Sequence, residues 1–134
     1  MGNLTTVEVK AFVPAKDFAL SKRFYQDFGF ELAWSDDQLA YLRHGNSSFL
    51  LQDFYEPVHA GNFMMHLLVE DVDAWWRHVE AQGLAAKYGV KAEPPEDRSW
   101  GIRDFILVDP TGVLWRVGQN ISGGRRAAAS AESR

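Results

Sequence analysis

Apolar side chains recur at spacings of three and four residues in two segments of the chain, residues 17–29 and 71–83. This is the period of a helix with one buried face, so the pattern predicts two amphipathic helices. Each segment opens with an aspartate suited to cap a helix and closes with a glycine suited to the left-handed position after its last turn. Helical spacing places Trp75 and Trp76 in the core rather than in a stacking platform for a ligand. The apolar faces consist of Leu20, Phe24, Tyr25 and Phe28 in the first segment and of Val72, Trp75, Trp76 and Val79 in the second.

Outside these helices, apolar and polar residues alternate, which is the period of strands that bury one face. In the first strand, residues 7–13, the side chains of Glu8, Lys10 and Phe12 point away from the valine-rich face. A less regular strand is predicted at residues 86–90, and the two prolines that follow predict a polar rim or lid loop from Glu93 to Arg98. The remaining strands are predicted at residues 31–35, 38–44, 48–54, 64–69, 102–108 and 113–118.

The order of elements occurs twice. When the chain is aligned with itself, the capping aspartates and the closing glycines of the two helices coincide, and each half reads strand, helix, three strands. We therefore predict an α+β fold in one domain, residues 1–121, made of duplicated βαβββ modules at about 5–54 and 62–120. The curled mixed sheets should surround a cavity, with the helices outside. Residues 122–134 lack an apolar pattern and are expected to form a flexible tail.

The composition of the chain restricts which partners and which chemistry the protein can have. Aromatic residues make up 13% of the chain, so some of them are expected to line a pocket or an interface. A formal charge of -4 and the lack of a basic stripe argue against nucleic acid as a partner. The absence of cysteine excludes disulfides, thiolate zinc sites and a cysteine nucleophile. No signal-peptide pattern and no apolar run of about 18 residues is present, so we expect a cytoplasmic protein without a membrane partner.

Several short motifs follow one another in the order found in a known family. One of them is a tight turn, in which Asp109-Pro110 starts the turn and Gly112 supplies the positive φ that closes it. Together the motifs resemble the vicinal oxygen chelate superfamily of glyoxalase I, extradiol dioxygenases and bleomycin-resistance proteins. The resemblance spans about residues 5–120 and is greatest to bleomycin-resistance-type members. The motifs are Val13–Phe18, Arg23–Tyr25, Gly29–Phe30, Val69–Asp73, Trp100–Phe105, Asp109–Gly112 and Gly118–Gln119.

The resemblance also implies where a metal would bind, namely on the first and last strands of each module. Divalent cations need carboxylate or imidazole ligands, and a lysine with an arginine would repel them. We therefore expect no metal and no other cofactor, which leaves enzymatic activity uncertain but disfavoured. A shifted site made of His66 and Glu8 stays open. The residues at the four family positions are Lys10, Gln52, Met64 and Arg116.

Strand alternation predicts which side chains line the cavity. An acidic chain suits a cationic drug, whereas Lys10 and Arg116 suit an anion, so the identity and charge of the ligand stay open. Trp34, Tyr41, Trp100 and Arg103 are candidates for the wall or rim, because the pattern leaves the facing of their strands ambiguous. The predicted ligand-binding residues are Glu8, Lys10, Phe12, Gln52, Phe54, Met64, His66, Trp100, Arg103, Leu114 and Arg116.

Two of these side chains have competing interpretations. Arg116 either donates to an oxygen of the ligand or forms an ion pair with Glu8 across the cavity. His66 either contacts the ligand or is satisfied by Glu8 or a backbone carbonyl. The other histidines are expected in solvated turns or on the outer face of a helix: His44, His59 and His78.

The resemblance implies that the protein binds a small molecule without a metal and without reaction. It would sequester a drug or metabolite in a cleft between the two modules. The competing interpretations are a metal-dependent lyase, isomerase or dioxygenase with a displaced metal site, and an interaction module whose cavity is vestigial. We expect a homodimer, because large aromatics exceed what a core of this size needs and because burying edge strands removes a pairing hazard.

Overall fold

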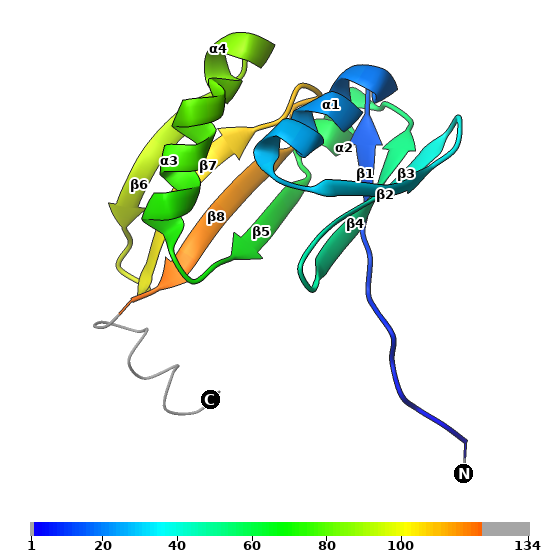
Figure 1. Cartoon of the computed structure of the whole chain (residues 1–134), viewed down its shortest axis with the longest axis horizontal. Coiled ribbons are helices and arrows are strands. Elements are labelled where there is room, and N and C mark those ends of the chain that lie inside the picture. The colour runs from blue at the N-terminus through cyan, green and yellow to red at the C-terminus, as the bar shows by residue number, and fades with distance from the viewer. Residues whose placement is uncertain (1, 122–134) are drawn as a thin grey trace.

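The structure is a computed structural model that describes residues 2–121, so the predicted tail at 122–134 lies outside the described part. The chain follows the predicted order twice, with α1 over the first sheet and α3 over the second (Figure 1). Within the described residues, every helix is too short or too polar to cross a membrane. The elements are β1 (Phe12–Ala15), α1 (Phe18–Phe28), β2 (Glu31–Ser35), β3 (Leu39–His44), β4 (Ser47–Asp53), α2 (Pro57–Gly61), β5 (Met64–Leu68), α3 (Val72–Gln82), α4 (Leu84–Tyr88), β6 (Ala92–Asp97), β7 (Ile102–Val108) and β8 (Leu114–Asn120).

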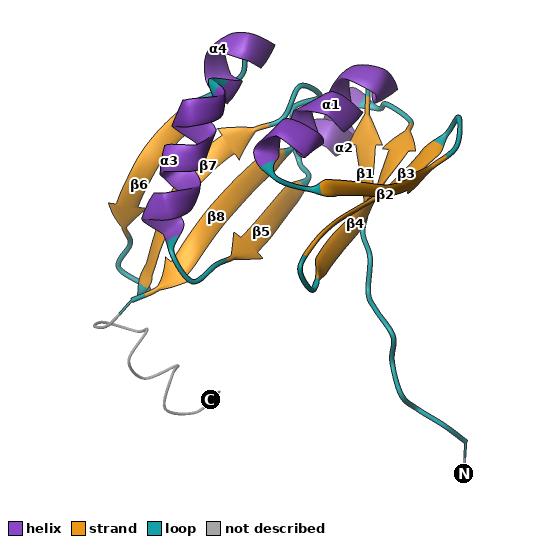
Figure 2. Ribbon diagram, viewed as in Figure 1, coloured by secondary structure: helices purple, strands orange, loops and turns teal. Residues whose placement is uncertain are grey.

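Each module forms a four-stranded mixed sheet, and the two sheets have equivalent strand orders. The orders are β1-β4-β3-β2 and β5-β8-β7-β6. In both sheets the first pair is parallel and the other two pairs are antiparallel. The predicted α+β class and the duplication of modules are therefore confirmed. Helices α1, α3 and α4 gather on one side of the strands, and the two sheets remain separate rather than closing into a barrel (Figure 2).

The two long helices begin and end where the sequence predicts. Asp17 and Asp71 each accept a hydrogen bond from the backbone N–H three residues further on, at 3.1 and 3.0 Å. Gly29 and Gly83 follow the last turns with φ of 131° and 62°, a region that disfavours residues with a Cβ. The helix boundaries are thus set by local chemistry that the sequence displays directly.

The predicted strand at residues 86–90 is wrong, because residues 86–88 belong to the helix α4. Leu84 is fully buried and anchors the segment to the core, and Gly89 at φ 64° ends it. Burial of Leu84 against distant residues outweighs the weak strand pattern. Another short helix, α2, was not predicted, although Glu56 caps it by accepting from two backbone N–H groups.

The segment from Glu93 to Arg98 was predicted to be a loop, whereas residues 92–97 form β6 at the edge of the second sheet. Pro94 and Pro95 lack the N–H that a central strand would donate. An edge position tolerates this loss, and the pairing with β7 also shifts register between Glu93 and Glu96. The edge and the register shift together allow a strand that contains two prolines.

The first strand is shorter than predicted. Its ladder with β4 starts at the pair Phe12–Leu50, whereas alternation predicted a strand from residue 7. Residues 2–11, which we call the N-terminal arm, run away from the body of the molecule (Figure 1). Val7 and Val9 are 96% and 92% exposed. The alternation of apolar and polar residues indicates a tendency to form a strand, but a strand also needs a neighbouring strand to pair with. Residues 7–10 have no such neighbour in the described part of this chain.

The two modules share one aromatic core. Trp115 of β8, in the second module, lies 5.7 Å from Phe30 and 5.3 Å from Phe49 of the first module, measured between ring centroids. Trp75 and Trp76 are partly buried and pack against this core, as predicted. Contacts of this kind between large rings contribute much of the burial that joins the two halves.

A chain of buried hydrogen bonds joins the same two modules. The Tyr25 hydroxyl donates to Asp109 Oδ2 at 2.5 Å and accepts from Trp115 Nε1 at 2.8 Å. Asp109 Oδ1 also accepts from the three backbone N–H groups of residues 111–113, at 2.9 Å each, within the predicted turn that Gly112 closes at φ 111°. Burial raises the pKa of Asp109 and raises the pKa of Tyr25 well above its usual value, so Tyr25 stays a neutral donor.

Replacing Tyr25 by Phe is expected to lower the free energy of unfolding by about 1–3 kcal/mol, because Asp109 and the Trp115 indole each lose a partner while buried. Urea unfolding measured by circular dichroism gives this quantity. The control is Tyr55→Phe, which removes a hydroxyl from a partly exposed ring and should change stability by less than about 0.5 kcal/mol. Equal losses in the two variants would contradict the role given to Tyr25.

Candidate functional site

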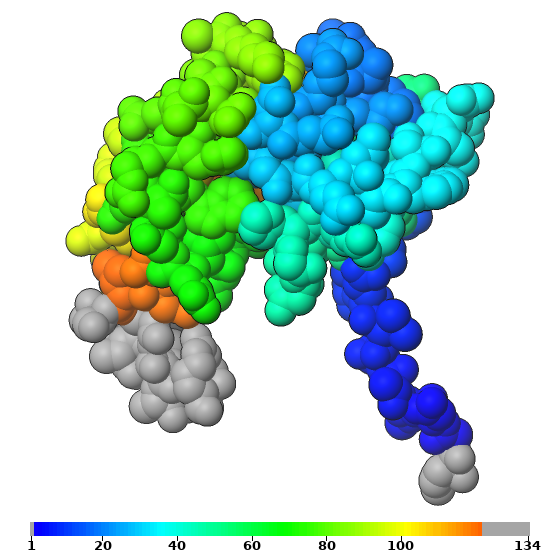
Figure 3. Space-filling view, viewed as in Figure 1, coloured from blue at the N-terminus to red at the C-terminus, as the bar shows by residue number. Residues whose placement is uncertain are grey.

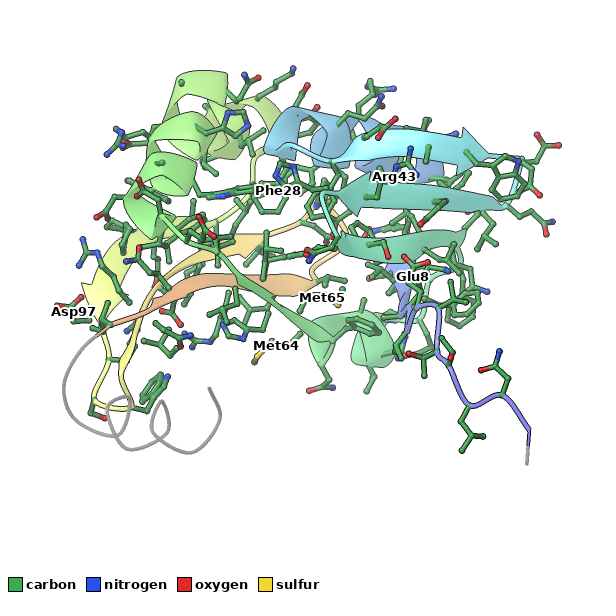
Figure 4. The ribbon with its side chains drawn as sticks, turned by 60° about the horizontal axis from the view of Figure 1, so that its bottom comes forward. Glu8, Phe28, Arg43, Met64, Met65 and Asp97 are labelled. Atoms are coloured by element: carbon green, nitrogen blue, oxygen red, sulfur yellow. The ribbon has the colours of Figure 1, made fainter. Side chains whose placement is uncertain are left out.

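The side chains that point away from α1 and α3 form one face of the two sheets, which we call the open face. In β5, Leu67 is buried and Met65 packs against the core, whereas Met64 and His66 are exposed. Figure 4 shows Met64 and Met65 on opposite sides of β5. The predicted cavity residues that strand alternation places on this face are Phe12, Gln52, Met64, His66, Leu114 and Arg116.

Large apolar side chains are unusually exposed on the open face. Phe12, Met64 and Leu68 are 51%, 56% and 50% exposed. Trp34 in β2 and Trp100 in the turn between β6 and β7 are also about half-exposed. Large apolar side chains that are exposed on one face are typical of a surface that binds a ligand or a partner.

A buried carboxylate, Asp104, organises the open face of the second sheet. Its Oδ1 accepts from Arg98 Nε at 2.8 Å and its Oδ2 accepts from Arg116 Nη1 at 3.1 Å, while the Asp104 side chain is only 2% exposed. A buried charge is costly without such partners. The two arginines therefore stabilise the carboxylate, and the carboxylate in turn fixes the positions of their guanidinium groups. Asp104 and Arg98 are not among the site residues predicted from the sequence. The available signal was an acidic residue within the mainly apolar strand β7.

Arg116 therefore has its ion-pair partner on β7, and the alternative pairing with Glu8 is not present. Only Nη1 of Arg116 is engaged in a hydrogen bond among residues 2–121, and the side chain is 30% exposed. The buried carboxylate fixes one edge of the planar guanidinium, and the remaining N–H groups can donate to another acceptor. Arginine is suited to this because its donors form a rigid fork.

Glu8 and Lys10 form a second polar cluster, and Figure 4 shows Glu8 beside β4. The Glu8 carboxylate accepts from Lys10 Nζ at 2.8 Å, from the Tyr41 hydroxyl at 3.1 Å and from Ser48 Oγ. These donors, Lys10 first, lower the pKa of Glu8 to about 2, so its carboxylate is charged at neutral pH. The Lys10 ammonium also lies 5.2 Å from the centroid of the Tyr41 ring. The cluster ties the root of the N-terminal arm to the first sheet.

His66 lies beside Arg116, its register partner on the neighbouring parallel strand. Its ring packs over Gly118, because a Cβ at position 118 would lie 3.1 Å from His66 Nε2 and 3.0 Å from Ile102 Cγ2. A side chain at position 118 would therefore displace the imidazole. Glu8 is bound elsewhere, so His66 remains exposed next to Arg116 and can contact a ligand.

The other histidines differ in part from the prediction. His44 and His59 are exposed as expected, with His44 at the end of β3 and His59 in α2. His78 was expected on an outer helix face, but it is half-buried, and its Nε2 lies 3.1 Å from the carbonyl oxygen of Asp27 in α1. It links the two long helices rather than facing solvent.

Arg103 does not reach the open face. It donates from Nε to Asp73 at 3.1 Å and from Nη1 to Asp97 at 3.0 Å, and it thereby joins the β6–β7 hairpin to the first turn of α3. Its neighbour Asp104 takes the open-face position, in a strand whose facing the sequence pattern left ambiguous. Phe54 follows the end of β4, about half-exposed, with its ring 6.2 Å from that of His59.

The residues at the family's metal-binding positions do not fit a cation. Lys10 and Arg116 carry positive charge, Met64 offers only a thioether, and Gln52 offers one carbonyl oxygen. Within residues 2–121 no group of three His, Cys, Asp or Glu side chains lies close enough to hold a metal ion. The open face thus combines apolar surface, hydrogen-bond donors and one imidazole without a ligand set for a divalent cation.

Comparison with known sequences relates most of the chain to one family. Residues 7–117 match the Glyoxalase/Bleomycin resistance protein/Dioxygenase superfamily. The chain is also 28% identical over 115 residues to a bleomycin resistance protein of Klebsiella pneumoniae, an alignment that covers 81% of this chain and 88% of the relative. The family match at residues 7–117 includes both modules and ends within β8.

Solved structures with the same fold have different activities. A bleomycin-binding protein complexed with bleomycin superposes with a TM-score of 0.72 at 25% identity, covering 86% of this chain and 99% of that one. Lactoylglutathione lyase from Agrobacterium tumefaciens superposes with a TM-score of 0.64 at 20% identity, covering 87% and 96%. The likeness to the lyase concerns the fold alone. The choice between binding and catalysis therefore depends on the side chains of the open face.

The protein is expected to contain no stoichiometric zinc, nickel, iron or manganese when purified without a histidine tag, because Lys10 and Arg116 occupy two of the four ligand positions. Elemental analysis of the wild type and of His66→Ala measures this. A stoichiometric metal in the wild type that is lost in His66→Ala would contradict the prediction and would indicate the shifted site with Glu8.

Proposed function

The chain belongs to the Glyoxalase/Bleomycin resistance protein/Dioxygenase superfamily, and we propose that within it this protein binds a small molecule without a metal and without reaction. The observation that carries the proposal is the open face. There, the half-exposed Met64 and Leu68 lie on β5, the strand next to Arg116, whose position a buried carboxylate fixes. Apolar walls with a few convergent polar groups are the usual composition of a small-molecule site.

Arg116 is the residue most suited to recognise the polar part of the ligand. Asp104 binds one edge of its guanidinium, so the side chain loses little freedom when a ligand binds the rest. His66 lies beside it and adds an imidazole that can donate or accept. The apolar part of the ligand would contact Met64, Leu68 and Leu114 on the same face.

Drug sequestration is the form of binding that we propose. The relatives that support it are a bleomycin resistance protein and a bleomycin-binding protein in complex with its drug. Bleomycin is therefore the first ligand to test. The identity and charge of the natural ligand are separate questions, because the open face carries both acidic and basic groups.

A homodimer is part of the same proposal. Exposed apolar side chains on the open face and on the N-terminal arm exceed what a stable monomer normally leaves in water. A second copy that covered part of this surface would bury it and would narrow the open face into a cleft. A cytoplasmic location, predicted from the composition, also belongs to the proposal.

Bleomycin is expected to bind saturably with a dissociation constant of about 1 μM or below, since sequestration requires the drug to be held at low concentration. Trp34 and Trp100 are half-exposed, so quenching of tryptophan fluorescence can report binding. The titration is repeated after treatment of the protein with EDTA, which should leave the affinity unchanged. Lack of saturation in both titrations would rule out bleomycin, and binding only before EDTA treatment would favour a metal-dependent site.

Arg116→Met and Arg98→Met form a matched pair, because each removes one of the two partners of Asp104. Each is expected to lower the free energy of unfolding by about 1–3 kcal/mol, as for loss of a hydrogen bond to a buried charge. Only Arg116→Met should also weaken bleomycin binding, by about tenfold or more, which corresponds to about 1.4 kcal/mol. Urea unfolding and the fluorescence titration measure the two effects. An equal loss of affinity in both variants would show that Arg116 acts only on the fold.

A further inference from the structure

A hollow lies between the two modules on the helix side of the sheets, away from the open face. It has a volume of about 390 Å³ and lies where the end of α1, the end of β3 and the middle of α3 meet. In the space-filling view, the surfaces of α1 and α3 adjoin on this side of the molecule (Figure 3). The residues that line the hollow include no Lys, Arg, Asp or Glu, and they are Phe28, Gly29, His44, Ala74, Trp75 and His78.

Aromatic rings from both modules border this hollow. The ring centroid of Trp75 lies 4.9 Å from that of His44 and 6.4 Å from that of His78, with interplanar angles of 69° and 78°. Phe28 lies 5.8 Å from Trp75 at 77° and is fully buried at the junction of α1 and α3 (Figure 4). Rings that meet at such angles enclose a space instead of stacking. Trp75 and the two imidazoles are the rings that a ligand can reach.

All three of these rings converge on Gly29. A Cβ at position 29 would lie 3.4 Å from Trp75 Cζ3 and 3.8 Å from His78 Nε2, and its backbone has φ of 131°. The carbonyl oxygen of the same residue lies 2.8 Å from His44 Nδ1. A side chain at this position would therefore enter the space between the rings, and glycine leaves that space free.

The two imidazoles offer hydrogen-bond acceptors to the hollow. His44 Nδ1 bonds to the carbonyl oxygen of Gly29, and His78 Nε2 bonds to that of Asp27 at 3.1 Å. A carbonyl oxygen only accepts, so these nitrogens carry the hydrogen atoms. In a neutral imidazole the other nitrogen is then an acceptor. Neither ring has a free N–H for an anion.

The end of α1 adds to the negative potential. The carbonyls of Asp27 and Gly29 belong to the last turn of α1 and to its cap, where the helix dipole carries partial negative charge. Within α1 the last turn contains no basic residue. Lys87 of α4 pairs with the Asp27 carboxylate at 2.6 Å, so these two charges offset each other.

We propose that this hollow binds a small organic cation of the quaternary ammonium class. The π face of Trp75 attracts such a cation, and its methyl groups suit apolar walls. A primary ammonium is strongly hydrated and needs several acceptors, so it suits the hollow less well. The volume is in the range of small-molecule sites. The site is distinct from the open face and does not require that the open face bind a drug.

Choline and dimethylbutanol are a matched pair of probes, because a carbon atom in the alcohol replaces the charged nitrogen of choline. Choline is expected to bind at least about fivefold more tightly, since only the charged group gains cation–π attraction. The titrations are followed in proton–nitrogen correlation NMR spectra under mildly alkaline conditions, in which imidazole is neutral. Equal affinities for the two probes would overturn the assignment of a cation.

The same spectra locate the bound choline. The chain has five Trp, and each has one indole N–H. The signal that is absent from Trp75→Leu belongs to Trp75, and choline should shift it. A choline-induced shift confined to the signals of Trp34 or Trp100 would place the cation on the open face and would overturn the proposal.

Trp75→Leu is expected to weaken choline binding at least about fivefold, because it removes the π face and keeps an apolar side chain. The control is Trp76→Leu, the same change at the next residue of α3, whose ring packs 5.1 Å from that of Phe105. This control should keep its affinity for choline. Equal losses in both variants would show that choline binding depends only on the packing of α3, contrary to the proposal.

Variants of His44 test the walls without disturbing the core, because this residue is exposed. His44→Leu removes a ring and should weaken choline binding by about threefold, whereas His44→Phe keeps a ring and should bind choline more tightly than His44→Leu. Equal affinities of these two variants would exclude a role for the aromatic wall.

A peptide that carries trimethyllysine and vesicles of phosphatidylcholine present the same head group on larger partners. Choline should bind at least as tightly as the peptide, and the protein should not sediment with the vesicles. A peptide that binds about tenfold more tightly than choline, or sedimentation with the vesicles that Trp75→Leu abolishes, would overturn the assignment to a small molecule.

Discussion

The relative position of the two modules depends on the buried hydrogen bonds that join Tyr25, Asp109 and Trp115. One hydroxyl from the first module must reach a carboxylate and an indole from the second, and any shift would leave buried polar groups without partners. The neighbouring Thr111 strengthens this constraint, because its hydroxyl oxygen accepts from the backbone N–H of Lys16 at 3.0 Å. The turn after β7 is thereby fixed to the segment that leads into α1.

The open face depends on this junction through β8. Trp115 and Arg116 are consecutive, so the interaction that seats the indole in the core also sets the position of the guanidinium on the other side of the sheet. Asp104 then orients Arg116 from β7. Fold and site are therefore coupled through adjacent residues of one strand, one of which is held in the core while the other faces the open side of the sheet.

What the sequence predicts well is what depends on neighbours along the chain. Aspartate caps, closing glycines and the Asp109–Gly112 turn all act within a few residues, and each has the predicted geometry. Other features depend instead on packing against residues that are distant in the sequence. They are the side of the sheet that Arg103 faces, the helix that contains Leu84 and the strand that contains Pro94. The pairing of Arg98 and Arg116 with Asp104 was missed for the same reason, since a hydrogen bond between strands leaves no mark on the spacing of residues. The repeated modules were predictable because they display the same local chemistry twice.

The two prolines of β6 have a consequence for association of the protein with itself. An unpaired apolar arm that can add to any strand edge would favour open-ended filaments. β6 forms the outer edge of the second sheet, and at Pro94 and Pro95 it has no N–H to offer to an incoming strand. The β6 edge is therefore a poor site for the addition of a further strand, which disfavours growth of the sheet from that side.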